Sequence, residues 1–207
     1  MGNNSFSVEK VIQVLSYLQE KSKIKNYQIL IKYVFFADRY LIRKFATPLL
    51  DEPKYYAMKQ GPVASITLDI ITKDKSHLYD ISQDELNLID NYIDTKGYEA
   101  TIKRIENYDL LSKADIEALE FVLNNFTGFD RETIIKITHQ YPEWTKFNRG
   151  FINPRTRYAM SFDDFFMNPG NIERKEIFKI LGAEDPFLTF GQNPEELSLA
   201  REAFQNC

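Results

Sequence analysis

The stretch YQILIKYVFFADRYLIRKF, residues 27–45, decides the fold. Its apolar side chains occupy nearly every position around a helix, a pattern typical of a helix that is buried on most of its sides rather than one that lies on a surface. We therefore expect residues 27–45 to be the central helix of a mainly α protein, a compact helical domain built around this buried helix.

Asp38 is the acidic exception within this stretch, because its neighbours one helical turn before and one turn after are apolar. A buried carboxylate is costly unless it is paired or hydrogen-bonded, so Asp38 needs a partner from elsewhere in the fold. We hypothesise that it accepts hydrogen bonds from the free amides of a helix that begins at Gly61 to Ala64.

The segment YYAMKQGPVAS, residues 55–65, contains a Gly-Pro step. The residue before a proline is pushed out of helical geometry, and proline suits the first turn of a helix. The step therefore predicts Gly61 as a hinge and Pro62 as the start of a helix. The following residues fit a helical face, but Ile66, Leu68 and Ile70 also alternate as in a strand, and periodicity alone leaves both open.

Capping residues and periodicity predict further elements on both sides of the central helix. In chain order these are a helix from Val8 capped by Ser7, a short helix within 82–95, a small β-hairpin within 95–105, a helix from Ser112 to Thr127-Gly128, a helix capped by Asp130 and ended by Pro142, and a last helix over 194–205. We expect a helical domain over residues 1–147 and, over residues 148–207, a C-terminal appendage that packs on it and ends in a helix.

Composition limits the classes of protein to be considered. Hydrophobic residues make up 43% of the 207 residues and aromatic residues 14%, which is ample material for a packed core. The 26 Lys and Arg against 30 Asp and Glu give a net charge of −4, so the basic footprint of a nucleic-acid-binding protein is missing. A DNA-binding autoregulator built on the helices of 112–141 stays a weaker alternative, since a partner would have to supply the basic surface.

Cysteine usage and hydropathy point to the cytoplasm. The only cysteine, Cys207, is the last residue, which leaves no internal disulfide framework and no cysteine-based zinc site. No stretch approaches the ~18 apolar residues of a membrane span. The sequence thus predicts a cytoplasmic protein without a membrane partner.

Catalytic chemistry has little support. His77 and His139 are the only histidines, and neither has a second ligand at metal-binding spacing. We interpret His139 as a histidine at a helix end, favoured there by the helix dipole and hydrogen-bonded to a neighbour. With no phosphate-binding loop and no nucleophile beside a base, we predict no catalytic residues, no metal and no cofactor. A small hydrolase or transferase that uses His139 with Asp38 or Glu143 remains the alternative.

Four stretches together resemble a known family. YVFFADRYLIRKFATPLL (33–50), YYAMKQGPVAS (55–65), LLSKADIEALEFVLNNF (110–126) and ITHQYPEW (137–144) occur in the order found in the Panacea domain of SocA-like antitoxins. The resemblance covers roughly Val8 to Phe147. Its most specific parts are Phe36 to Arg39, Gly61 to Val63, and Thr138-His139 with Trp144.

The resemblance implies a compact, mainly helical domain and a helix after Pro62. It also implies an antitoxin that is not an enzyme and neutralises a cognate protein toxin, encoded by a neighbouring gene, by direct binding. Toxins of unrelated kinds occur across the family, and one branch acts as an adaptor for a protease such as ClpXP. The partner-binding or motif residues implied for this chain are Asp38, Arg39, Tyr56, Met58, Lys59, Gly61, Pro62, His139 and Trp144, of which Tyr56, Met58 and Lys59 are expected to border the partner surface.

Overall fold

The computed structural model describes residues 7–50, 54–74, 76, 78, 81–150 and 156–190, together with 195, 198, 199, 201 and 202. Within these residues the protein is mainly α, as predicted. The α-helices are α1 (Val8–Ser22), α2 (Tyr27–Phe45), α3 (Ser65–Thr72), α4 (Gln83–Tyr92), α5 (Lys113–Phe126), α6 (Arg131–Thr138), α7 (Pro142–Thr145) and α8 (Asn171–Leu181). Short 3-10 helices cover η1 (Asn148–Gly150), η2 (Phe162–Phe166) and η3 (Pro186–Thr189).

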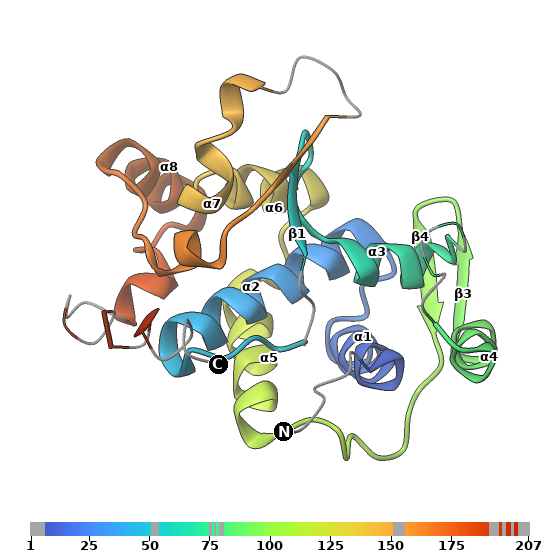
Figure 1. Ribbon diagram of the computed structural model, residues 1–207. Coiled ribbons are helices and arrows are strands. Elements are labelled where there is room, and N and C mark those ends of the chain that lie inside the picture. Colours follow the sequence, from blue (N-terminus) through green and yellow to red (C-terminus); the bar gives the residue numbers. More distant parts are fainter. Residues whose placement is uncertain are drawn as a thin grey trace.

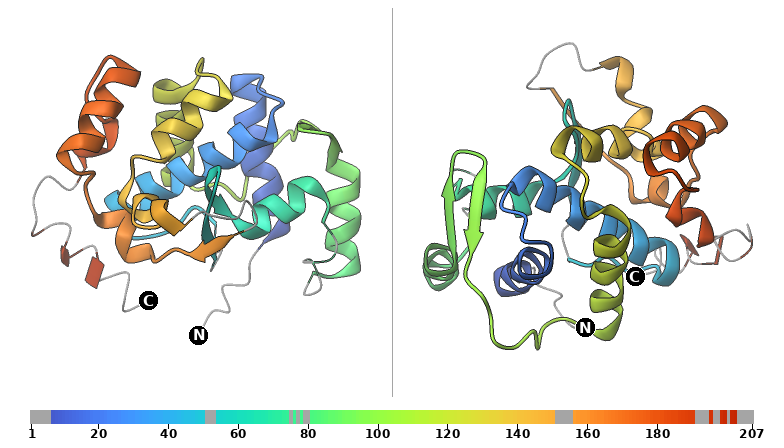
Figure 2. Two further views of the ribbon diagram at one scale, coloured as in Figure 1. Left: turned by 90° about the horizontal axis from the view of Figure 1, so that it is seen from above. Right: turned by 180° about the vertical axis from the view of Figure 1, so that it is seen from behind.

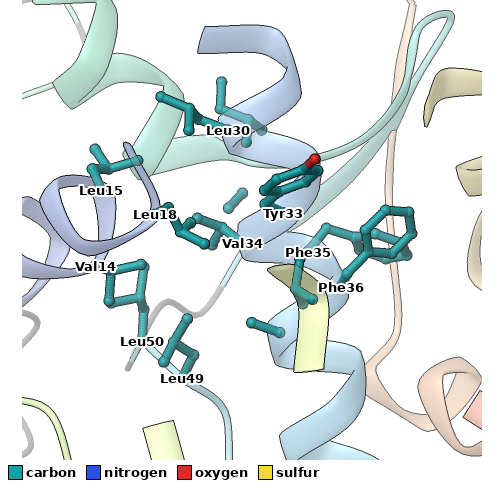
Figure 3. Packing of buried hydrophobic residues seen from close by; sticks show 14 of the residues in the cluster. Val14, Leu15, Leu18, Leu30, Tyr33, Val34, Phe35, Phe36, Leu49 and Leu50 are labelled. Carbon is teal, nitrogen blue, oxygen red and sulfur yellow. The ribbon is translucent and has the colours of Figure 1, made fainter. Parts of the chain in front are cut away.

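Helix α2 crosses the middle of the molecule with α1, α5 and α6 around it (Figure 1). It begins after Asn26, whose side chain accepts hydrogen bonds from the amides of Gln28 and Ile29, and every residue from Ile29 to Arg43 is buried. Figure 3 shows Leu18 of α1 and Val34 of α2 facing each other, whereas Phe35 and Phe36 lie on the other side of α2. The prediction of a buried central helix over 27–45 is confirmed, bounds included.

Two small antiparallel sheets complete the fold. One is a hairpin of β3 (Ile93–Lys96) and β4 (Glu99–Ile102), which confirms that a hairpin follows α4 but begins before the predicted range of 95–105. The other has the strand order β2-β1-β5, with β1 (Tyr55–Met58) in the middle, β2 (Gly61–Ala64) on one side and β5 (Arg157–Ala159) on the other. The β3–β4 hairpin and α4 lie at one end of the molecule, and helix α8 lies at the opposite end (Figure 2).

The predicted helix start at Pro62 is wrong. Gly61–Ala64 is the strand β2, paired with β1 through Met58↔Gly61 and Tyr55↔Ala64, and helix α3 begins only at Ser65. Pro62 is tolerated because β2 is an edge strand, where the missing N–H of proline disturbs the sheet least. The helix implied by the resemblance is confirmed from Ser65 onward.

The other helix boundaries agree with the sequence except at one place. Ser7, Ser112 and Asp130 cap α1, α5 and α6 through their side chains, as predicted. Helix α6, however, ends at Thr138, and Pro142 begins α7 instead of ending the preceding helix. Proline at the first helical position needs no amide partner, which explains why it starts a helix here.

The C-terminal region adds aromatic side chains to the core that surrounds α2. The ring of Phe165 lies 5.6 Å from that of Phe35, and the ring of Phe187 lies 6.0 Å from that of Phe36. Strand β5 and helix α8 were not predicted from the sequence. The helix predicted over 194–205 falls largely outside the described residues.

Gly61 is fixed by two constraints, and its replacement is the first test of the fold. Its φ of +96° is a region that L-residues rarely adopt, and a Cβ there would lie 2.7 Å from Thr138 Oγ1. Gly97 in the β3–β4 turn has a φ of +62° but nothing within 4 Å of a Cβ. We expect Gly61→Ala to lower the free energy of unfolding by at least ~2–3 kcal/mol and Gly97→Ala by about 1 kcal/mol, measured by urea denaturation. Equal losses in the two variants would contradict the close contact.

Candidate functional site

Asp38 fixes the start of the β1–β2 hairpin from inside α2. It is 1% exposed, and its carboxylate accepts hydrogen bonds from the Leu49 amide at 2.6 Å and from the Tyr55 hydroxyl. Burial raises the pKa of Asp38 to about 7, and the two hydrogen bonds act in the opposite direction. The hypothesis that Asp38 binds a helix N-terminus at Gly61 to Ala64 is wrong, because that segment is a strand. Its partners come from the loop after α2 and from the first residue of β1.

Arg39 joins α2 to the chain beyond α6. Its guanidinium donates to Glu143 Oε1 at 2.6 Å and to the carbonyl oxygens of Phe165 and Met167 at 3.3 and 2.9 Å, and it lies 4.3 Å from the centre of the Tyr141 ring. Both side chains of the Arg39–Glu143 ion pair are fully buried. Burial raises the pKa of Glu143, opposed by the charge of Arg39. Arg39 therefore holds the framework together and has no surface for a partner.

Trp144 and His139 hold the other end of the hairpin. Trp144 is 4% exposed and donates from Nε1 to the carbonyl oxygen of Met58 at 2.8 Å. The His139 ring stacks on it, with ring centres 3.6 Å apart and planes inclined by only 6°. Burial lowers the pKa of His139 to about 4, so the ring is neutral at pH 7. His139 lies at the C-terminal end of α6, as predicted, and its buried Nε2 has no hydrogen-bond partner among the described residues.

The motif residues therefore divide into two groups. Asp38, Arg39, Gly61, Pro62 and Trp144 are buried and hold the hairpin against α2, α6 and α7. The expected rim residues are accessible: Tyr56 and Met58 are half-buried and Lys59 is exposed. His139 is half-buried beneath the same hairpin.

Two neighbouring hollows flank the outer face of the hairpin. The first has a volume of about 250 Å³ and is lined by Tyr27, Gln28, Ile31, Lys32, Met58, Lys59, Gln60, Val63, Leu68 and Ile135. The second, of about 310 Å³, shares Tyr27, Met58, Val63 and Leu68 with the first and adds Tyr56, Ser65, Asp69, Thr72, Asp74 and Arg157. The guanidinium of Arg157 lies 4.9 Å from the centre of the Tyr56 ring. The hairpin thus carries a mostly apolar, partly aromatic surface along its length.

Lys32 is the site residue that sequence reasoning missed. It is 3% exposed, and its Nζ donates to the Pro62 carbonyl at 2.6 Å. In the described part of the chain it forms no ion pair with a carboxylate, and burial, with a smaller effect of Arg131, lowers its pKa to about 7. The available signal was that Lys32 is the only charged residue between Tyr27 and Ala37 of an otherwise apolar helix.

The residues of the alternative enzymatic site, His139, Asp38 and Glu143, each contact a different partner. His139 stacks on Trp144, Asp38 binds Leu49 and Tyr55, and Glu143 binds Arg39, so neither carboxylate shares a hydrogen bond with His139. Within the described residues, no three His, Cys, Asp or Glu side chains are grouped so that they could hold a metal ion. None of the helices described is long and apolar enough to cross a membrane.

Comparison with protein families assigns the domain. The family model "Antitoxin SocA-like, Panacea domain" matches residues 30–145, more than half of the 207-residue chain. The chain belongs to the SocA-like antitoxin family. Comparisons with curated proteins and with solved structures gave no match. The match to the Panacea domain includes α2 from residue 30 onward, the β1–β2 hairpin and α7, that is, both the framework residues and the hairpin rim.

Trp144 of the Panacea domain should behave as a core residue. Trp144→Ala removes a buried ring, its stacking on His139 and its bond to Met58, and we expect a loss of about 3–5 kcal/mol in the free energy of unfolding. Trp144→Phe keeps one aromatic ring but loses the hydrogen bond and part of the buried indole volume, so the loss should be smaller, about 2–3 kcal/mol. Chemical denaturation of both variants measures this. An unchanged stability of Trp144→Ala would instead identify Trp144 as an exposed anchor.

Lys32 should destabilise the folded protein in a pH-dependent way. Its folded pKa of about 7 lies below the ~10.4 of an unfolded lysine. As the pH falls, Lys32 therefore takes up its proton at a higher pH in the unfolded chain than in the folded protein. The resulting loss in the free energy of unfolding begins near pH ~10 and reaches its full size below pH ~7. Each pKa unit corresponds to about 1.4 kcal/mol, so the penalty exceeds the ~1–2 kcal/mol of the bond to Pro62.

We therefore expect Lys32→Met to melt at a higher temperature than the wild type at pH 6, with a difference that shrinks toward pH 10. Thermal melts across this pH range measure the difference. Lys136→Met, at an exposed position of α6, is the control and should show no such trend. A Lys32→Met variant that is less stable at pH 6, or a difference independent of pH, would contradict the assignment.

Proposed function

We propose that this chain is the antitoxin of a toxin–antitoxin pair and that it neutralises a protein toxin, encoded by a neighbouring gene, by binding it directly and without catalysis. The observation that carries this proposal is membership of the SocA-like antitoxin family over residues 30–145. Fold alone does not fix function, so the site has to supply the mechanism.

The hairpin surface supports binding of a protein. Among the outer side chains of β1 and its turn, Met58 borders both hollows, Lys59 the first and Tyr56 the second. The guanidinium of Arg157 lies against the Tyr56 ring. Tyr, Met and Arg are enriched where proteins bind one another, and energetically important residues gather around apolar pockets. The buried framework holds this surface in place before the toxin arrives, which lowers the entropic cost of binding.

Co-expression with the product of the neighbouring gene tests the function. We expect the chain to restore growth and to co-purify with that product at about 1:1, with a Kd well below micromolar. Rescue should persist in cells that lack the protease ClpXP, because occlusion needs no degradation. A neighbour that is not toxic, or rescue that survives loss of binding, would contradict neutralisation by direct binding. Rescue that requires the protease would favour the adaptor role instead.

The hairpin rim should carry binding without carrying stability. We expect Tyr56→Ala with Lys59→Glu to weaken toxin binding at least ~tenfold with a melting temperature close to that of the wild type, since both residues lie at the accessible rim. Lys96→Glu makes the same charge change at an exposed position of the other hairpin and should leave binding unchanged. Calorimetric titration of the purified proteins measures both. Equal affinity of the rim variant and the control would place the interface elsewhere.

A further inference from the structure

The first hollow has an apolar wall and a basic floor. Six of its lining residues are apolar or aromatic, namely Tyr27, Ile31, Met58, Val63, Leu68 and Ile135. The polar ones are Lys32, Lys59, Gln28 and Gln60, and none is acidic. At the mouth, Gln28 Nε2 donates to Gln60 Oε1 at 2.9 Å, and Gln28 Oε1 accepts from Arg131. The hollow is therefore suited to a group that is apolar and negatively charged.

Lys32 has unused donors at the floor of the hollow. An ammonium group carries three N–H donors, and the Pro62 carbonyl accepts one of them. The charged or titratable groups around Lys32 are Arg131 and His139 at the two ends of α6 and Lys59 in the hairpin turn. On the α3 side, Asp69 lines only the second hollow. A carboxylate on Lys32 would thus supply the counter-charge that the described fold does not.

The first hollow, taken alone, has room for a side chain rather than for a whole small molecule. Its volume of about 250 Å³ lies below the ~300–1,000 Å³ of pockets that enclose a whole small molecule. It shares four lining residues with the second hollow, so a chain segment bound in the first can continue over the second along the hairpin. Charge-assisted hydrogen bonds to a desolvated ammonium are among the stronger polar contacts in proteins.

We propose that this hollow receives a segment of the toxin in which an apolar side chain stands beside a carboxylate, and that the carboxylate binds Lys32 Nζ. The inference rests on the proposed function and specifies the chemistry of its partner. It also gives a reason for a buried lysine that destabilises the free protein, since functional groups are often held at a cost in stability.

Two variants with matched controls test the proposal. Lys32→Met removes the charge at nearly constant volume, and we expect it to weaken binding of the toxin from the neighbouring gene by ~10–100-fold, mainly through faster dissociation. Gln60→Glu places a carboxylate at the exposed mouth without disturbing the core, and we expect at least ~tenfold weaker binding from like-charge repulsion. Lys136→Met and Gln83→Glu repeat the two charge changes at exposed positions outside the hollow and should bind as the wild type does.

The pH dependence separates a charge contact from a merely structural role. Raising the pH from ~6 to ~9 removes the proton of Lys32 in the free protein, so the wild type should bind more weakly, whereas binding by Lys32→Met should change less. His139 stays neutral over this range, because its pKa is about 4. The difference between wild type and variant therefore reports Lys32.

The outcomes distinguish this proposal from the function on which it rests. If Lys32→Met and Gln60→Glu bind the toxin within twofold of the wild type and still neutralise it, the proposal is overturned while the antitoxin function stands. If the wild type itself neither binds nor neutralises the toxin, both this proposal and the antitoxin function are contradicted. If the variants bind normally but added hexanoate shifts the Lys32 Cε resonance of the wild type, the hollow takes a small carboxylate instead, and the proposal is again overturned.

Discussion

The buried ion pair between Arg39 and Glu143 is the interaction on which the rest of the structure depends. Removing one partner of such a pair leaves an uncompensated charge in the core and typically costs ~3–5 kcal/mol. Arg39 also binds the carbonyl oxygens of Phe165 and Met167, so it ties the central helix to the C-terminal region. Glu143 directly precedes Trp144, which holds the hairpin through Met58. The buried Arg39–Glu143 pair thus determines, through Trp144, where the β1–β2 hairpin lies.

This arrangement explains why the family's motif residues are mostly buried. They build a frame from three hydrogen-bonded pairs and one close packing contact. The pairs are Asp38 with Tyr55, Arg39 with Glu143 and Trp144 with Met58, and the packing contact is that of Gly61 with Thr138. In the complex that we propose, the toxin contacts what this frame leaves accessible, which is the hairpin rim and the hollow over Lys32. The resemblance implies toxins of unrelated kinds across the family, and a constant frame with a rim that can change would accommodate this without a change of fold.

The sequence predicted those elements whose signals are local. The all-round apolar pattern of residues 27–45 and the side-chain caps Ser7, Ser112 and Asp130 gave helices with nearly correct bounds. Helix α8 was missed because Gly170 provides no side-chain cap and Ile177 is its only fully buried residue. Its hydrophobic face is therefore too narrow to produce a clear period.

Other features could not be predicted because they depend on contacts between distant segments. Pairing with β1 makes Gly61–Ala64 a strand, although a Gly-Pro step taken alone favours a helix start. The partners of Asp38 come from 11 and 17 residues along the chain. Lys32 is buried where the hairpin packs on α2, and its Nζ donates to the Pro62 carbonyl. Burial of this kind leaves no periodic signal in the sequence.

The most direct test of the central claim, that the toxin binds over the hairpin and its first hollow, is hydrogen–deuterium exchange of the chain alone and in complex with the product of the neighbouring gene. The account predicts new protection in residues 56–63, in α3 and at the start of α2, with little change in α4 and α8. Protection confined to α8 or to the β3–β4 hairpin, with residues 56–63 exchanging as in the free chain, would contradict it.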